Sequence, residues 1–132
     1  MTVVINHVQI KGVPELLSNL QRVDEHIRND VALEAVQEGA SVIQNRAMRN
    51  APVRTAALRN SIRVESRRTG NGAEAEVGPH VIYGRIQELG GFTGRGHRTY
   101  IKGKFYLSNA VKQTRGEVSR VMAATIQDYL GD

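Results

Sequence analysis

The segment PELLSNLQRVDEHIRNDVALEAVQEGASVIQNRAMR, residues 14–49, decides the fold class of this 132-residue chain. Its stripe of apolar and small side chains recurs every three or four residues, as on one face of an α-helix. The stripe runs through Leu16, Leu20, Val23, Ile27, Val31, Ala35, Gly39, Val42 and Arg46. A single helix of this length would span roughly 50 Å, more than the core of a small domain covers. We therefore expect a break near residues 29–30 or Gly39, or a protruding end, and either outcome leaves apolar surface for a neighbour.

Shorter patterns flank the long helix. Pro52 ends it, because the residue before a proline is pushed out of the α region. The alternation of apolar and polar residues predicts a β-hairpin whose outer face places arginines opposite glutamates, as on a solvated surface. The other predicted elements are a strand at 3–10, hairpin strands at 61–67 and 73–77, a short helix at 81–89 and a second long helix from 105 to about 130.

Residues 90–104, GGFTGRGHRTYIKGK, differ from the rest of the chain. They hold five glycines and several cations but no acidic residue, and they show no clear period. We expect a flexible basic loop here, with a short strand at 99–101. The order of elements predicts one α+β domain, residues 1–132, in which a small, mostly antiparallel sheet packs against two long helices and a short one.

Composition excludes several kinds of site. The chain has no cysteine, which removes disulfides, thiolate zinc sites and cysteine nucleophiles. Its first residues lack the pattern of a signal peptide, and no segment approaches the roughly 20 apolar residues of a membrane span. We therefore expect a soluble chain with no membrane partner.

The residue pattern offers no catalytic or metal site. The four histidines, at positions 7, 26, 80 and 97, show neither the i, i+4 pairing nor the nearby carboxylate of a metal site. Glu34 and Glu38 share one side of the long helix, which is typical of a charged outer face. No nucleophile elbow, P-loop or dinucleotide fingerprint occurs. The sequence therefore predicts no enzyme activity, no metal and no cofactor.

The charge balance points to an acidic partner. Eighteen Lys and Arg against thirteen Asp and Glu give a net charge of +5 and a pI near 10. Arginine binds carboxylates as well as phosphates, so the partner is either nucleic acid or an acidic protein surface. Only residues 90–104 form an unopposed basic block, which favours protein docking. The candidate partner-binding residues are Phe92, Arg95, His97, Arg98, Tyr100 and Lys102.

Three segments resemble one family. APVRTAALRNSI at 51–62, YGRIQELG at 83–90 and FYLSNA at 105–110 are similar, in order and spacing, to boxes of the Hong Kong 97-type tailed-phage morphogenesis proteins. These are neck and tail-completion subunits that join tail to head, and the resemblance covers roughly residues 14–130. Ala56 stands where the family usually has glycine, and Lys104 and Asn109 replace prolines.

The resemblance implies a structural virion protein of the neck or tail that is assembled in the host cytoplasm. It implies a ring of six copies that docks on phage tail and head-connector proteins, with lumen arginines beside transiting DNA but without sequence preference. Two other tail roles, terminator and minor tail protein, stay open, as does a non-specific nucleic-acid-binding accessory protein. Phe105 and Leu107 would pin the last helix to the first. The fold determinants in the boxes are Pro52, Leu58, Ile62, Tyr83, Glu88, Gly90, Phe105 and Leu107.

Overall fold

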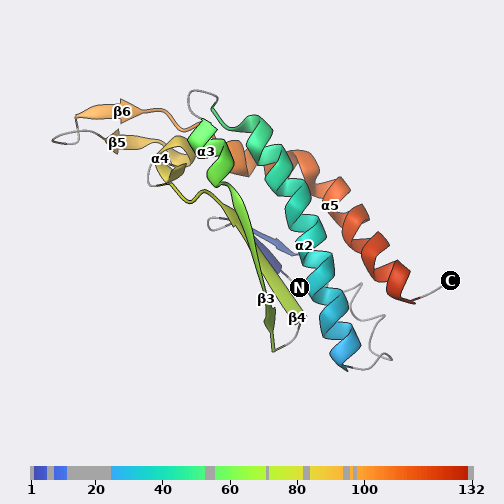
Figure 1. Ribbon diagram of the computed structural model, residues 1–132. Helices are drawn as coiled ribbons and strands as arrows, with labels where there is room; N and C mark the ends of the chain where they lie inside the picture. The colour runs from blue at the N-terminus through green and yellow to red at the C-terminus, as the bar shows by residue number, and fades with distance from the viewer. Residues whose placement is uncertain are drawn as a thin grey trace.

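The computed structural model has the predicted α+β architecture, with one main sheet, one small sheet and two long helices (Figure 1). The structure describes residues 2–5, 8–11, 25–52, 56–70, 72–81, 84–93, 96 and 98–130. Its helices are α2 (Glu25–Asn50), α3 (Ala56–Ser61), α4 (Gly84–Leu89) and α5 (Tyr106–Leu130). Its strands are β1 (Thr2–Ile5), β2 (Val8–Lys11), β3 (Arg63–Thr69), β4 (Gly72–Gly78), β5 (Gly91–Thr93) and β6 (Thr99–Ile101).

The main sheet joins the strands at 2–11 to the hairpin in the middle of the chain. Its strand order is β2-β1-β4-β3, with antiparallel pairs at both edges and a parallel pair, β1 with β4, at the centre. The single strand predicted at 3–10 is wrong, because this segment forms two strands that pair antiparallel, Val3 opposite Ile10. The hairpin predicted from alternation is confirmed as β3 and β4.

Helix α2 runs unbroken through residues 29–30 and Gly39, so the predicted break is wrong. Residues 14–24, and with them a protruding end, lie outside the described part of the chain. The break is unnecessary because α5 lies alongside α2 and covers its apolar stripe (Figure 1). Gly39 marks a close approach instead, since a Cβ there would come within 2.8 Å of Met122 Sδ. The glycine that resembles a helix breaker thus lets the two helices pack closely.

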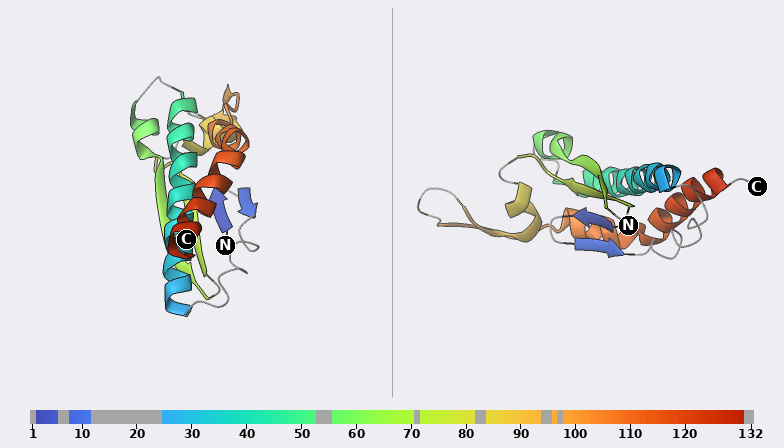
Figure 2. Two further views of the ribbon diagram at one scale, coloured as in Figure 1. Left: turned by 90° about the vertical axis from the view of Figure 1, so that its right-hand side faces the viewer. Right: turned by 90° about the horizontal axis from the view of Figure 1, so that it is seen from below.

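The hydrophobic core lies between α2, α5 and one face of the main sheet (Figure 2). On β4, alternate residues Ala73, Ala75 and Val77 are buried, and their small size lets α2 pack close to the sheet. The apolar side chains buried on the two long helices are Val31, Ala32, Ala35, Val36, Ala40, Ile43, Ala47, Leu107, Ala110, Val111, Val118, Met122 and Ile126.

The box residues take different places around this core. Helix α2 ends at Asn50, two residues before Pro52, and Leu58 and Ile62 are buried beyond it. Leu107 is buried, but the Phe105 side chain is 46% exposed, so the prediction that it pins the last helix to the first is wrong. Phe105 has a φ of 52°, and the buried aromatic ring at this point belongs to the next residue, Tyr106. Tyr83 lies outside the described residues.

Candidate docking surface

A two-stranded arm, formed by β5 and β6, projects from the end of the molecule where α2 ends and α5 begins (Figures 1 and 2). The strands pair antiparallel, with Gly91 opposite Ile101 and Thr93 opposite Thr99. The strand predicted at 99–101 is present. Its partner strand, residues 91–93, was predicted as loop. Pairing between the two strands satisfies backbone N–H and carbonyl groups on both of them.

The arm exposes an aromatic pair. Phe92 and Tyr100 lie directly opposite each other across the two strands, so their side chains share one face of the ribbon. Their ring centroids are 5.3 Å apart and the ring planes are tilted by 58°. Phe92 is 61% exposed and Tyr100 64% exposed. Such a pair presents an apolar ridge to solvent, which is typical of a residue cluster that anchors a protein interface.

Cations flank this ridge. Arg98 and Lys102 directly flank β6, two residues before and after Tyr100, and continued alternation would place them on the face of the aromatic pair. Both are exposed, and neither forms an ion pair with any residue that the structure describes. Four of the six candidate partner-binding residues therefore share one surface, and the other two, Arg95 and His97, lie outside the described residues.

Two glycines fix the root of the arm. A Cβ on Gly90, which has a φ of +79°, would lie 2.7 Å from the Gly103 backbone nitrogen and 2.8 Å from the Ile101 carbonyl oxygen. A Cβ on Gly103 would meet the Leu89 backbone at 2.8 Å. The two chain segments thus cross at backbone contact, which only glycine permits. The arm is therefore anchored at its root by direct backbone contact between the two segments.

The Glu88 carboxylate holds this root to the last helix. Glu88 is 2% exposed, and it accepts hydrogen bonds from the backbone N–H of Leu107 at 2.8 Å and of Ser108 at 2.9 Å. The Ser108 hydroxyl donates a third bond at 2.7 Å. These N–H groups belong to the first turn of α5, where they have no partner within the helix, and a negative charge is favoured there by the helix dipole.

Backbone and phenol hydrogen bonds complete the junction. The Phe105 N–H donates to the Glu88 carbonyl at 3.0 Å, and Lys104 N–H donates to Gln87 at 2.7 Å. The buried Tyr106 hydroxyl donates to the Gly84 carbonyl at 2.9 Å. Burial, and next the Glu88 carboxylate, raise the pKa of the Tyr106 phenol, so it stays a donor. Arm, α4 and α5 therefore form one connected unit.

The hydrogen-bond partners of Glu88 were not predicted from the sequence. Ser108 lies 20 residues from Glu88, and no local spacing connects the two. Gly103 was one of five glycines in a segment without a period, and its close approach depends on the tertiary crossing. One signal in the sequence could have indicated the capping contact. The first turn of α5 holds no acidic residue of its own, so an acidic group from elsewhere in the chain can take that place.

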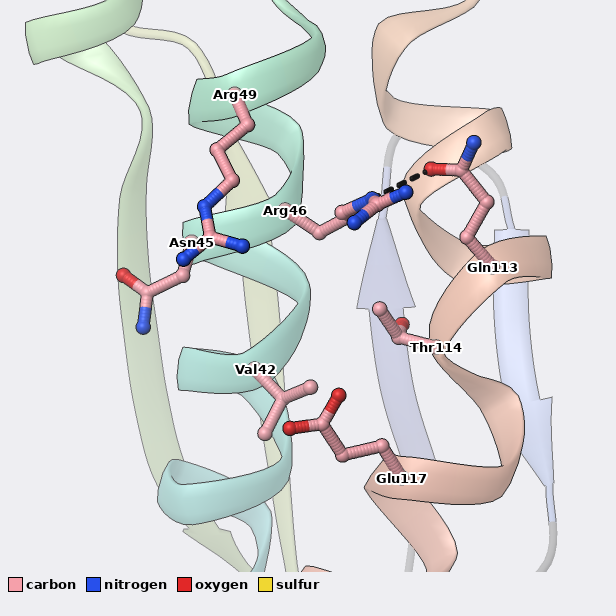
Figure 3. A pocket seen from close by; sticks show the side chains of 7 residues that line it. All are labelled: Val42, Asn45, Arg46, Arg49, Gln113, Thr114 and Glu117. Carbon is pink, nitrogen blue, oxygen red and sulfur yellow. Dashed lines mark hydrogen bonds between the residues drawn. The ribbon is translucent and has the colours of Figure 1, made fainter.

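A second candidate site is a shallow hollow between α2 and α5, on the side of the helix pair away from the strands (Figure 3). It has a volume of about 220 Å³. The Gln113 side-chain oxygen accepts from Arg46 Nε and from Asn50 Nδ2, both at 2.9 Å, and so ties the two helices together there. The lining residues are Val42, Asn45, Arg46, Arg49, Gln113, Thr114 and Glu117. This mixed, open lining suits a protein contact better than an enclosed small-molecule site.

Within the described ranges, no cluster of three or more His, Asp or Glu side chains could hold a metal ion. In the same part of the chain, no helix combines the length and the apolarity that crossing a bilayer requires.

One histidine does meet a carboxylate, contrary to the sequence-based expectation. His80 Nε2 lies 2.9 Å from Glu65 Oε1, and its Nδ1 lies 3.1 Å from the Ser61 carbonyl oxygen. Both neighbours are acceptors, so the ring makes both bonds only when both nitrogens carry a proton. The Glu65 hydrogen bond, followed by that of Ser61, raises the pKa of His80 above its ordinary value of 6.5.

We expect the His80 bonds to make stability depend on pH. Because the pKa is higher in the folded chain, the contribution of His80 is full below about pH 6.5 and is lost as the pH rises through the folded-state value. The His80→Gln variant should therefore show a lower urea midpoint than the parent chain at about pH 5.5, and a smaller difference at about pH 8.5. An equal difference at both pH values would contradict this assignment.

Comparison with known proteins identifies a family. No curated protein and no solved structure matches the chain. A family model described as "Bacteriophage HK97-gp10, putative tail-component" matches residues 15–90. This range takes in α2, α3, the β3–β4 hairpin and α4, and it ends at Gly90 in the root of the arm. More than half of the chain is matched, and the chain belongs to the HK97-gp10-like family of phage tail components.

Proposed function

We propose that this protein is a structural component of the virion that acts in head–tail joining or tail completion. Copies of the chain assemble into a ring, which docks on tail proteins on one side and on connector proteins on the other. The chain performs this task through contacts and without catalysis. Family membership supports a tail role, and the arm supports docking as its mode of action.

The observation that carries the proposal is the exposed aromatic pair on the arm. Leaving two large rings in water costs hydrophobic free energy, on the order of 1 kcal/mol or more for each ring. The arm is held away from the body at a fixed root, so the rings have no place in the core (Figure 1). A partner that covers Phe92 and Tyr100 would remove this cost, and flanking cations select a partner with acidic groups.

The proposal is tested by a nonsense allele of the gene in a phage that encodes this chain. The expected phenotype is filled heads and finished tails that remain unattached, counted by electron microscopy. Supplying the full-length chain from a plasmid should restore attachment. Complete infectious particles in the absence of the protein would contradict the proposal.

The same experiment separates the other tail roles. Loss of a tail terminator would give overlong tails, and loss of a minor tail protein would leave defective tails on the heads. A nucleic-acid-binding accessory protein would instead show tight binding to duplex DNA at physiological salt. We favour docking over this last role, because the exposed aromatic pair with flanking cations suits a protein interface.

A further inference from the structure

We propose that the arm of one copy binds the acidic seam of a neighbouring copy. The acidic seam is the outer rim between α2 and α5 that carries Glu38, Glu117 and Asp128 beside Val42. This inference rests on the ring proposed above and identifies the contact that joins its subunits. It follows from two sets of charges of opposite sign, neither of which forms an ion pair within the part of the chain that the structure describes.

The seam is defined by the antiparallel packing of the two long helices. Arg46 of α2 contacts Gln113 of α5. Toward the start of α2 and the end of α5, the Tyr129 hydroxyl donates to Glu34 Oε2 at 2.6 Å. Between these points Val42 and Glu117 line the hollow of Figure 3, where the Glu117 side chain reaches toward α2. The seam is therefore a continuous outer rim contributed by both helices.

Helical spacing places the other carboxylates on the same rim. Glu38 precedes Val42 by four residues, and Asp128 follows Glu117 by eleven, about three turns of helix. Glu38, Glu117 and Asp128 are exposed, and among the described residues none of them forms an ion pair. Val42 is only partly buried, and it is the apolar residue among the otherwise polar and charged lining of the hollow.

The arm carries the complementary set. Its aromatic ridge, Phe92 and Tyr100, would cover Val42, while Arg98 and Lys102 would meet the carboxylates on either side. Opposite charges arranged around an apolar centre give an interface both its register and its specificity. An Arg guanidinium is well suited to this role, because it can bind a carboxylate with two parallel hydrogen bonds.

The arm does not reach the seam of its own chain. Its root is fixed where Gly90 crosses Gly103, and the ribbon extends away from the paired helices (Figure 1). Arg46 and Arg49 line the hollow at the end of the seam nearest the arm root. The acidic part of the seam therefore runs from Glu117 toward the far end of the helix pair. The contact is therefore made between two molecules, and the two contacting surfaces are different parts of the chain. Such head-to-tail contacts close into a ring when the rotation between copies permits it.

Cross-linking in the full-length chain tests this contact directly. The native chain has no cysteine, so each introduced thiol is the only one at its site. The double variant Thr99→Cys/Asn45→Cys places one thiol on the arm and one at the hollow. With a short bis-maleimide it should give a ladder of covalent oligomers on a denaturing gel.

The matched control keeps the arm thiol and moves the second one to the outer face of the main sheet, as Thr99→Cys/Arg63→Cys. Arg63 is also exposed, but it lies on β3 and away from the seam. Both variants are examined in solution at up to about 1 mM and in assembled particles. A ladder from the seam pair alone supports the proposal. Equal ladders from both pairs, or no ladder from the seam pair in either setting, overturn it.

A charge exchange gives a second and independent test. Reversing the arm as Arg98→Glu/Lys102→Glu, or the seam as Glu38→Lys/Glu117→Lys, should weaken self-association by about tenfold or more in sedimentation equilibrium. Combining the four substitutions in one chain should restore association to within a few-fold of the parent. Failure of the combination to restore it overturns the proposal, even if each reversal alone weakens association.

Two outcomes separate this contact from the function proposed above. Arm variants that leave heads and tails unattached, but cross-link and self-associate as the parent does, would preserve the joining function and overturn the arm-to-seam contact. Arm variants that lose duplex DNA binding at physiological salt, with unchanged self-association, would overturn it in favour of a nucleic-acid partner.

Discussion

Glu88→Ala is expected to lower the free energy of unfolding by about 3 kcal/mol. The substitution removes the carboxylate that accepts three hydrogen bonds. The backbone N–H groups of Leu107 and Ser108 then lose their acceptor at a buried junction. Each unsatisfied buried group costs about 1 kcal/mol or more, and the loss of a favourable charge at the helix N-terminus adds to this. Urea unfolding followed by circular dichroism measures the change.

Two further substitutions test the origin of this loss. Glu88→Gln keeps one acceptor oxygen but turns an amide N–H₂ toward a donor, so an intermediate loss is expected. Glu117→Ala removes an exposed glutamate from the interior of α5 and should change the free energy of unfolding by no more than about 0.5 kcal/mol. If Glu88→Ala lowered the free energy of unfolding no more than Glu117→Ala does, the Glu88 carboxylate would not stabilise the start of α5.

Gly90→Ala is expected to cost about 2 to 4 kcal/mol and to release the arm from its root. The added Cβ would lie within 2.8 Å of two backbone atoms, which cannot rotate away as a flexible side chain can. The positive φ of this residue adds about 1 to 2 kcal/mol of strain for any residue with a Cβ. Trypsin cleavage in the arm should become faster, because a detached ribbon exposes Arg98 to the protease in an extended form.

The matched control is Gly116→Ala. Gly116 lies in the interior of α5, and a Cβ there would meet nothing within 4 Å. Alanine is a better helix former than glycine, so this variant should gain about 0.5 to 1 kcal/mol in the free energy of unfolding. A loss at position 116, or no loss at position 90, would contradict the distinction between the two glycines.

Local periodicity was sufficient to predict the helices and the central hairpin. The stripe from Val31 to Val42 repeats at helical spacing, and alternate residues on either side of the turn at 70–72 repeat at strand spacing. Both patterns are created by a single buried face, so the sequence records them directly. The predicted break in α2 failed because the length that one helix buries depends on its partner, and α5 proved equally long.

Pairings between distant segments produce no comparable periodic pattern in the sequence. Nothing within residues 2–11 shows that they form two short strands, or that the first of them pairs in parallel with β4 more than 70 residues later. Only one strand of the arm, at 99–101, was predicted; its partner at 91–93 has three residues, too few to display an alternation. Which candidate residues come together on the arm became apparent only from the cross-strand register.

The structure also gives a physical reason for two of the sequence boxes to occur together. The box at 83–90 contains Glu88, and the box at 105–110 contains the N–H groups that its carboxylate binds. Between them lies the arm, so the two boxes form the base from which it projects.

The parallel pairing of β1 with β4 has a consequence for the newly made chain. The partner of Thr2 in this pairing, Glu74, is synthesised about 70 residues after it. Until then the amino-terminal strand pair has no sheet to join, whereas α2 can collapse on the later hairpin as soon as that hairpin emerges. The β1–β2 pair is therefore expected to be among the last elements to reach its native place, although it is synthesised before α2 and the hairpin.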